Sequence, residues 1–182
     1  MSAEQLRPGA KIAAVHEAGH ATVAEYLNVR VERIRLSDYW LPPSTILQRP
    51  ELLDSERDGG ETSYASAATL DDQAVVTAAG QVAMNELAAP DELARFRCED
   101  SCKKDEDDLR GIASECGITD SDFPQWRLHK IERVREIVSM THVREAIQRV
   151  AADLLTAPLE DGLNGEHVRE VLRACETQLE TS

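Results

Sequence analysis

The stretch His16-Glu17-Ala18-Gly19-His20 decides the predicted fold and the predicted chemistry. On an α-helix, two histidines four residues apart lie on one face, one turn above the other, so both imidazoles can reach a single metal ion. Glu17 is rotated by roughly 100° from His16 and stays free to handle a proton of water. The motif therefore predicts a helix that carries a zinc site, with Glu17 as the catalytic base.

The residues around the motif predict that this helix is buried on the side of the histidines. Pro8 precedes the run and Asn28 follows it, and both are typical of helix boundaries. An alternative is that two buried histidines merely satisfy hydrogen bonds in a helical core. Gly19 argues against that alternative, because a glycine costs a helix about 1 kcal/mol relative to alanine and indicates the close approach of another segment or of a metal's surroundings. Apolar or small residues recur at helical spacing at Ile12, Val15, Gly19, Val23 and Leu27.

Length, composition and charge limit the class of protein. A chain of 182 residues with 42% hydrophobic residues suits one domain with a sizeable core. The four cysteines lack the density of a secreted disulfide scaffold and the N-terminus lacks a signal peptide, so we expect a cytoplasmic protein. No stretch approaches the ~20 apolar residues of a membrane span, and a net charge of −14 argues against nucleic acid as a partner.

The rest of the chain predicts a mostly α fold (α+β), with a small sheet beside the active-site helix. Residues 29–36 alternate apolar and charged side chains with one slip at Glu32-Arg33, which is close to the period of a half-buried strand. Residues 37–58 contain three prolines and are predicted to form a long loop, and the glycine turn at 59–60 leads into a second short strand.

Four more helices are predicted after these strands. We expect a single domain over residues 1–182, in which residues 1–120 form the catalytic part and residues 121–182 the C-terminal helical part. The expected helices run from a cap at Thr69 to before Pro90, over residues 105–116, over residues 126–155, and from the turn at 162–165 to the C-terminal region.

A third zinc ligand must come from elsewhere, because a catalytic zinc takes three protein ligands and keeps one open position. The acidic cluster Asp105-Glu106-Asp107-Asp108 opens the short predicted helix. Helical phase puts Asp105 near the centre of the apolar face and Asp108 on its flank, so we favour Asp105 and keep Asp108 as the alternative. Carboxylates stabilise a helix N-terminus without any metal, and this effect accounts for Glu106 and Asp107. It does not account for a carboxylate on the apolar face, because burying a carboxylate without a partner is costly.

With these residues identified, the chain resembles the peptidase domain of the FtsH-type zinc metalloproteases. Residues 11–24 read KIAAVHEAGHATVA, and the active-site helix of that family typically reads HEAGHA. The resemblance extends from about residue 8 to about residue 175. Weaker similarities follow in the family's order at residues 31–36, at Gly60-Glu61-Thr62-Ser63-Tyr64, at Ala79-Gly80-Gln81-Val82-Ala83 and at residues 163–168.

This resemblance implies a helical zinc-peptidase domain with a C-terminal helical bundle, in which an aspartate of a later helix completes the zinc site. Both Asp105 and Asp108 fit that aspartate. FtsH-type proteases join this domain to membrane helices and an ATPase ring, and nothing in this sequence resembles a phosphate-binding glycine loop. The resemblance therefore implies a stand-alone domain that cleaves flexible or unfolded polypeptide, with a separate ATPase or further copies of itself as candidate partners.

The predicted reaction is hydrolysis of peptide bonds. Zn²⁺ held by His16, His20 and Asp105 would lower the pKa of a bound water from about 15.7 towards about 7, and Glu17 would accept its proton. A binding or regulatory module that keeps the fold without turnover is the alternative function, and a metal-free helical scaffold is a third.

Supporting roles are predicted for two further pairs of residues. Thr62 and Ser63 lie on the second strand and are candidates for binding an extended substrate by edge pairing. Asn85 and Glu86 lie on the helix after Thr69 and are candidates for orienting the zinc-binding histidines.

Overall fold

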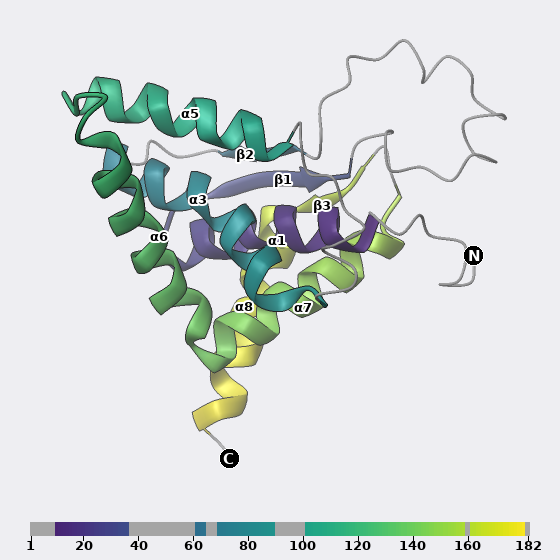
Figure 1. Cartoon of the computed structure of the whole chain (residues 1–182). Coiled ribbons are helices and arrows are strands. Elements are labelled where there is room, and N and C mark those ends of the chain that lie inside the picture. Colours follow the sequence, from purple (N-terminus) through teal and green to yellow (C-terminus); the bar gives the residue numbers. More distant parts are fainter. Residues whose placement is uncertain (1–9, 37–60, 65–68, 90–100, 159–160, 181–182) are drawn as a thin grey trace, which may run out of the picture.

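The computed structural model describes residues 10–36, 61–64, 69–89, 101–158 and 161–180, and it is mostly helical with a small sheet, as the sequence predicts (Figure 1). The predicted loop over residues 37–58 lies outside the described residues. The elements are α1 (Ala10–Tyr26), β1 (Val31–Arg35), β2 (Glu61–Tyr64), α3 (Leu70–Leu87), α5 (Ser101–Glu115), α6 (Phe123–Ser139), α7 (Thr141–Thr156), β3 (Leu163–Asn164) and α8 (Gly165–Glu180).

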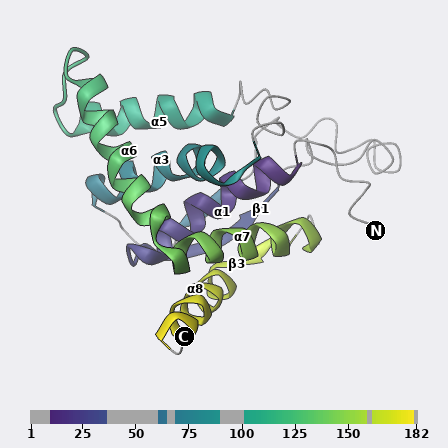
Figure 2. The same ribbon diagram turned by 60° about the horizontal axis from the view of Figure 1, so that its bottom comes forward.

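Helix α1 lies in the middle of the molecule. Figure 2 shows α5, α3, α1, α7 and α8 as successive layers, with α6 along one side, and α1 packs mainly against α3 and α7. Small side chains bring α1 and α3 close together: a Cβ added at Gly19 would lie 2.5 Å from the Cβ of Ala83 and 3.0 Å from the carbonyl oxygen of Ala79. The close approach that Gly19 predicts is therefore confirmed.

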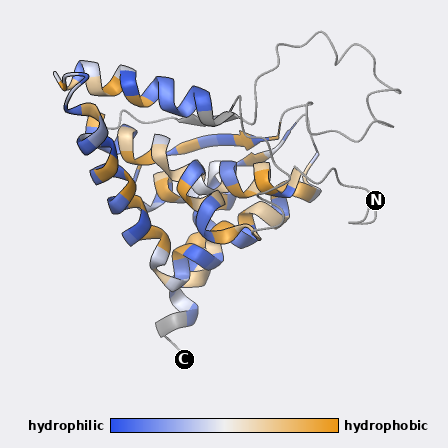
Figure 3. Ribbon diagram, viewed as in Figure 1, coloured by the Kyte–Doolittle hydropathy of each residue, from blue (hydrophilic) through white to orange (hydrophobic). Residues whose placement is uncertain are grey.

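The outer helices are amphipathic. Figure 3 shows hydrophilic and hydrophobic segments alternating along α5 and α6, which is typical of helices with one face on the core and one in solvent. None of the described helices combines the length and the apolarity that a membrane crossing requires.

The sheet has the order β2-β1-β3, and both pairs are antiparallel. Ile34 of β1 is fully buried and lies opposite Thr62 of β2. The register between these strands shifts between Val31 and Arg33, where the apolar alternation of the sequence slips. The slip in the pattern thus corresponds to a β-bulge, in which one strand carries an extra residue.

The turn predicted at residues 162–165 contains the short strand β3, which pairs with the other edge of β1. Gly162 has φ of +60°, and an added Cβ there would collide with the carbonyl oxygen of Ile34. An added Cβ at Gly165 would collide with the carbonyl oxygen of Val31. These two glycines are needed because the chain passes directly against β1.

The single helix predicted over residues 126–155 is wrong: it is two helices, α6 and α7, separated at Met140. Met140 is extended, with φ of −68° and ψ of 129°. The break allows α6 to pack against α3 while α7 packs against α1. Apolar periodicity did not reveal it, because each half keeps an apolar face and the interruption is one residue long.

A buried ion pair joins the end of α1 to β1 and α8. The side chain of Glu25 is 3% exposed and accepts hydrogen bonds from Arg169 Nε at 2.9 Å and Nη2 at 3.1 Å. The backbone N–H of Val31 donates a third hydrogen bond to Glu25 Oε1 at 2.9 Å. The carboxylate is thereby satisfied by two segments that are far apart in sequence.

We expect Arg169→Leu to lower the free energy of unfolding by about 2–4 kcal/mol, because it leaves the Glu25 carboxylate buried without its cation. Urea unfolding followed by circular dichroism measures this loss. Arg173→Leu is the matched control, since Arg173 is exposed one turn further along α8. Equal losses in the two variants would contradict the role assigned to the ion pair.

A second ion pair, between α3 and α6, makes stability depend on pH. Lys130 is buried and donates to Asp71, which also pairs with Arg133. The hydrogen bond from Lys130 and the charges of both cations hold the pKa of Asp71 below its ordinary value of 3.8, against the effect of burial. A carboxyl group whose pKa is lower in the folded state than in the unfolded state stabilises the fold at pH values above its unfolded-state pKa. This stabilisation is lost as the pH falls through the folded-state pKa.

We therefore expect Asp71→Asn to lower the thermal midpoint at about pH 6, with a difference from the unmodified protein that shrinks as the pH falls below the unfolded-state pKa of 3.8. Differential scanning calorimetry across this range measures the difference. A difference that stays constant with pH would show that the charge of Asp71 contributes nothing.

Candidate metal centre

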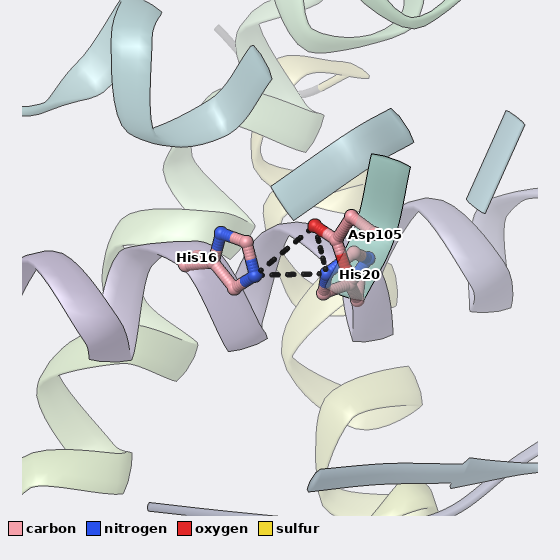
Figure 4. Close-up of side chains that lie close together, drawn as sticks. All are labelled: His16, His20 and Asp105. Atoms are coloured by element: carbon pink, nitrogen blue, oxygen red, sulfur yellow. Dashed lines mark hydrogen bonds and ion pairs between the residues drawn. The ribbon is translucent and has the colours of Figure 1, made fainter. Parts of the chain in front are cut away.

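The two histidines of the opening motif lie side by side on α1. His16 is 4% exposed and His20 is 7% exposed. Their rings meet edge to face, with centroids 4.6 Å apart, and the two Nε2 atoms are 3.1 Å apart (Figure 4). The four-residue spacing therefore produces the shared approach of both imidazoles that the sequence predicts.

Asp105 reaches the same point from α5. Its Oδ2 lies 3.3 Å from His16 Nε2 and 3.4 Å from His20 Nε2 (Figure 4). Asp108, the alternative ligand, is exposed on the same helix and is not part of this group. Helix α5 begins at Ser101, earlier than predicted, so Asp105 lies inside the helix rather than at its N-terminus.

The orientation of His20 is set by the backbone of α3. Its Nδ1 donates to the carbonyl oxygen of Val76 at 2.7 Å, so a neutral His20 presents the lone pair of Nε2 to the site. The prediction that Asn85 or Glu86 orients the histidines is wrong: both are exposed, and Glu86 pairs with Arg135 at 3.4 Å. The helical phase of α3 turns the side chains of Asn85 and Glu86 away from α1. The actual partner of His20 is a backbone carbonyl, which no residue type in a sequence can indicate.

The three donor atoms suit a divalent metal ion. A tetrahedral zinc with bonds of about 2.0–2.1 Å separates its ligand atoms by roughly 3.3–3.4 Å. The donor atoms of His16, His20 and Asp105 are 3.1 to 3.4 Å apart. Asp105 Oδ2 is buried and accepts no hydrogen bond within the described part of the chain, so a cation at this point would satisfy it.

Glu17 lies beside this group and is held by β2. It is 4% exposed, and the hydroxyl of Thr62 donates to its Oε2 at 3.0 Å. Thr62 was predicted to bind substrate, but its hydroxyl is directed at Glu17. Ser63 lies next to it and opposite Arg33 in the register of the sheet, and its side chain is outside the described residues.

Burial and mutual charge shift the pKa values of these groups. Burial lowers the pKa of His16 to about 4, with a further contribution from the charge of His20. Burial also opposes charge on His20, but the carboxylates of Asp105 and Glu17 outweigh it and raise the pKa of His20 to about 9. Burial raises the pKa of Glu17 to about 7. Such opposed shifts within one small cluster are typical of functional sites.

Gly80 of α3 forms a wall of the site, against both imidazoles. An added Cβ would lie 2.7 Å from His16 Cε1 and 2.8 Å from His16 Nδ1, and would collide with His20 Nε2. The sequence contains a signal for this requirement, because a glycine inside a helix with small neighbours indicates close contact.

Three donor atoms that could hold a divalent cation therefore lie beside a carboxyl group that could move a proton, and metal-assisted hydrolysis uses groups of these kinds. Comparison of the sequence with known protein families and with curated proteins finds no match. The function therefore has to be inferred from the geometry of the site and from the sequence motif.

We expect Gly80→Ala to weaken Zn²⁺ affinity by about 100-fold or more. Changing a residue that only orients a ligand typically costs about 10-fold to 100-fold, whereas the added methyl group would displace the ligating imidazoles themselves. Competition with a chromophoric chelator measures the affinity. Gly111→Ala is the control: nothing lies within 4 Å of its added Cβ, and it should keep the affinity and gain about 0.5–1 kcal/mol of helix stability. Unchanged affinity in Gly80→Ala would contradict the assigned wall.

Proposed function

We propose that this chain is a zinc-dependent metallopeptidase of the FtsH-like type, which hydrolyses peptide bonds in flexible or unfolded polypeptide. The observation that carries the proposal is the convergence of two imidazoles and one carboxylate, at distances that suit zinc, beside a buried glutamate. The resemblance of residues 11–24 to the FtsH-type active-site helix supports the same reaction.

In this proposal His16, His20 and Asp105 hold the ion through Nε2, Nε2 and Oδ2. A zinc ion held there would act as a Lewis acid, which would polarise a peptide carbonyl and make a water molecule more acidic. The hydrogen bond from His20 to Val76 keeps its ring in the orientation that ligation needs.

Glu17 acts as the general base and then as the general acid. One carboxylate oxygen, Oε2, is held by Thr62 at 3.0 Å, which leaves Oε1 to take a proton from the attacking water. Glu17 then delivers that proton to the leaving amine. Thr62 is therefore assigned to orientation of the base rather than to direct contact with substrate.

The sheet supports a polypeptide as the substrate. In the described part of the chain β2 is at the edge of the sheet and pairs on one side with β1. An unpaired strand edge accepts an extended peptide through backbone hydrogen bonds, which requires no particular substrate sequence. An extended conformation excludes folded substrates, so their cleavage would need a separate unfolding partner.

We expect Glu17→Gln to lower kcat/KM for a fluorescently labelled unfolded polypeptide by at least about 100-fold, because it removes the proton acceptor. Zinc content, measured by mass spectrometry, should stay at the level of the unmodified protein. Glu132→Gln, an exposed residue of α6, is the control and should keep full activity.

The same experiment separates the alternative functions. Equal cleavage by Glu17→Gln and the unmodified protein would remove Glu17 as the base. Bound zinc without hydrolysis of any unfolded substrate would replace the peptidase with a non-catalytic binding or regulatory module. Absence of bound zinc, with no effect of chelator on the thermal midpoint, would leave a metal-free scaffold.

A further inference from the structure

The third candidate ligand is carried by a helix with a small apolar contact area. Of the described side chains of α5, Leu109 and Ala113 are buried and Ile112 is half-buried. Lys103, Lys104 and most of the acidic residues of this helix are exposed. Hydrophobic packing alone would therefore fix α5 only weakly against α3. Asp105, however, must keep a fixed position to act as a ligand.

A single arginine of α6 connects α5 to α3 beside the site. Arg127 Nε donates to Glu106 Oε2 at 2.6 Å, and its Nη2 donates to Gln81 Oε1 at 3.1 Å. Glu106 follows Asp105 in sequence, and Gln81 follows Gly80. One guanidinium therefore contacts the neighbours of the two residues that approach the histidines from α5 and α3.

The second oxygen of Glu106 is also engaged. Arg110 Nη2 lies 3.4 Å from Glu106 Oε1, and the guanidinium of Arg110 lies over the ring of Phe123, 4.3 Å from its centroid. Glu106 is thus held by hydrogen bonds on both oxygens. Adjacent residues of a helix keep a fixed angle of about 100° to each other, so fixing Glu106 also fixes the direction of Asp105.

We propose that Arg127 is a positioning residue that holds α5 in the rotation at which Asp105 can bind the metal, and so sets the metal affinity of the site. This inference rests on the zinc site proposed above. The coupling is reciprocal: a metal bound by residues of both α1 and α5 strengthens the docking of α5.

A merely structural ion pair would behave differently. Partly exposed ion pairs contribute little to stability, and Arg127 and Glu106 are 29% and 31% exposed. If Arg127 served stability alone, its removal would shift the thermal midpoint and leave the metal affinity unchanged. A positioning role makes the opposite prediction, so the two readouts distinguish them.

The test compares Arg127→Gln with Arg135→Gln in the full chain. Arg135 also links α6 to α3, through Glu86, which is neither a candidate ligand nor the neighbour of one. We expect Arg127→Gln to bind Zn²⁺ about 10-fold to 100-fold more weakly, as is typical for residues that orient metal ligands. We expect Arg135→Gln to bind like the unmodified protein, and the metal-free thermal midpoints of the two variants to agree.

Cobalt gives a spectroscopic readout, because Co²⁺ in a tetrahedral site absorbs visible light according to its ligands. We expect the Co²⁺ spectrum of Arg127→Gln to weaken or shift at saturating metal. The double variant Glu106→Gln with Arg127→Gln should lose no more zinc affinity than Arg127→Gln alone, because both changes break the same ion pair. Arg127→Lys is the second variant, for the case that Arg127→Gln does not fold. It keeps the positive charge but cannot donate to Glu106 and Gln81 with the fixed geometry of a guanidinium, so it should also bind zinc more weakly than the unmodified protein.

The outcomes separate this inference from the proposed function. If the unmodified protein binds zinc and Arg127→Gln binds it equally tightly, the positioning role is overturned and the zinc site stands. If the unmodified protein binds no zinc, the metal centre fails and the positioning role fails with it.

Discussion

The close contact between α1 and α3 is the constraint on which the rest of the structure depends. Gly19 allows the two helices to approach, with Ala83 and the backbone of Ala79 directly opposite. Gly80, on the same face of α3, leaves room for the two imidazoles of α1. The interface that forms the core thus also forms the wall of the candidate metal centre. Its small side chains serve packing and chemistry together.

Around this interface, several buried polar groups of α1 are satisfied by other elements. His20 is held by the carbonyl oxygen of Val76, Glu17 by Thr62, and Glu25 by Arg169 and the N–H of Val31. Each of these bonds joins α1 to a different part of the chain, and each compensates for the removal of a polar group from water. Asp105 Oδ2, like His16 Nδ1 and Thr22 Oγ1, has no hydrogen-bond partner within the described residues. Asp105 Oδ2 differs from those two atoms because it belongs to a carboxylate and lies 3.3 and 3.4 Å from the two Nε2 atoms, and this arrangement favours a cation at the point where the three donors meet.

Features with a local physical cause were predicted well from the sequence. The histidine spacing predicted the shared face of α1, and Thr69 accepts a hydrogen bond from the N–H of Asp72 as an N-cap should. Asn28, two residues after the end of α1, adopts φ of +61°, where a boundary was expected. The slip at Glu32-Arg33 corresponds to the bulge of β1. In each case the residues that carry the signal are neighbours in sequence.

Features that depend on distant contacts were predicted poorly. Met140 is partly buried against the hydrophobic core, and the short strand β3 pairs with β1, which is far from it in sequence. The partner of His20 is a backbone carbonyl, which every residue possesses, so no residue type reveals it. The choice of Asp105 over Asp108 as a candidate ligand followed from helical phase, although the helix begins earlier than predicted. The apolar face, rather than the position of the N-terminus, carried that information.

The most direct test of the central claim is a crystal structure of the zinc-loaded protein, with anomalous diffraction measured at the zinc absorption edge. We predict one ion bound to His16 Nε2, His20 Nε2 and a carboxylate oxygen of Asp105. An anomalous peak elsewhere, or a structure grown in excess zinc with these three side chains apart and no ion between them, would contradict it.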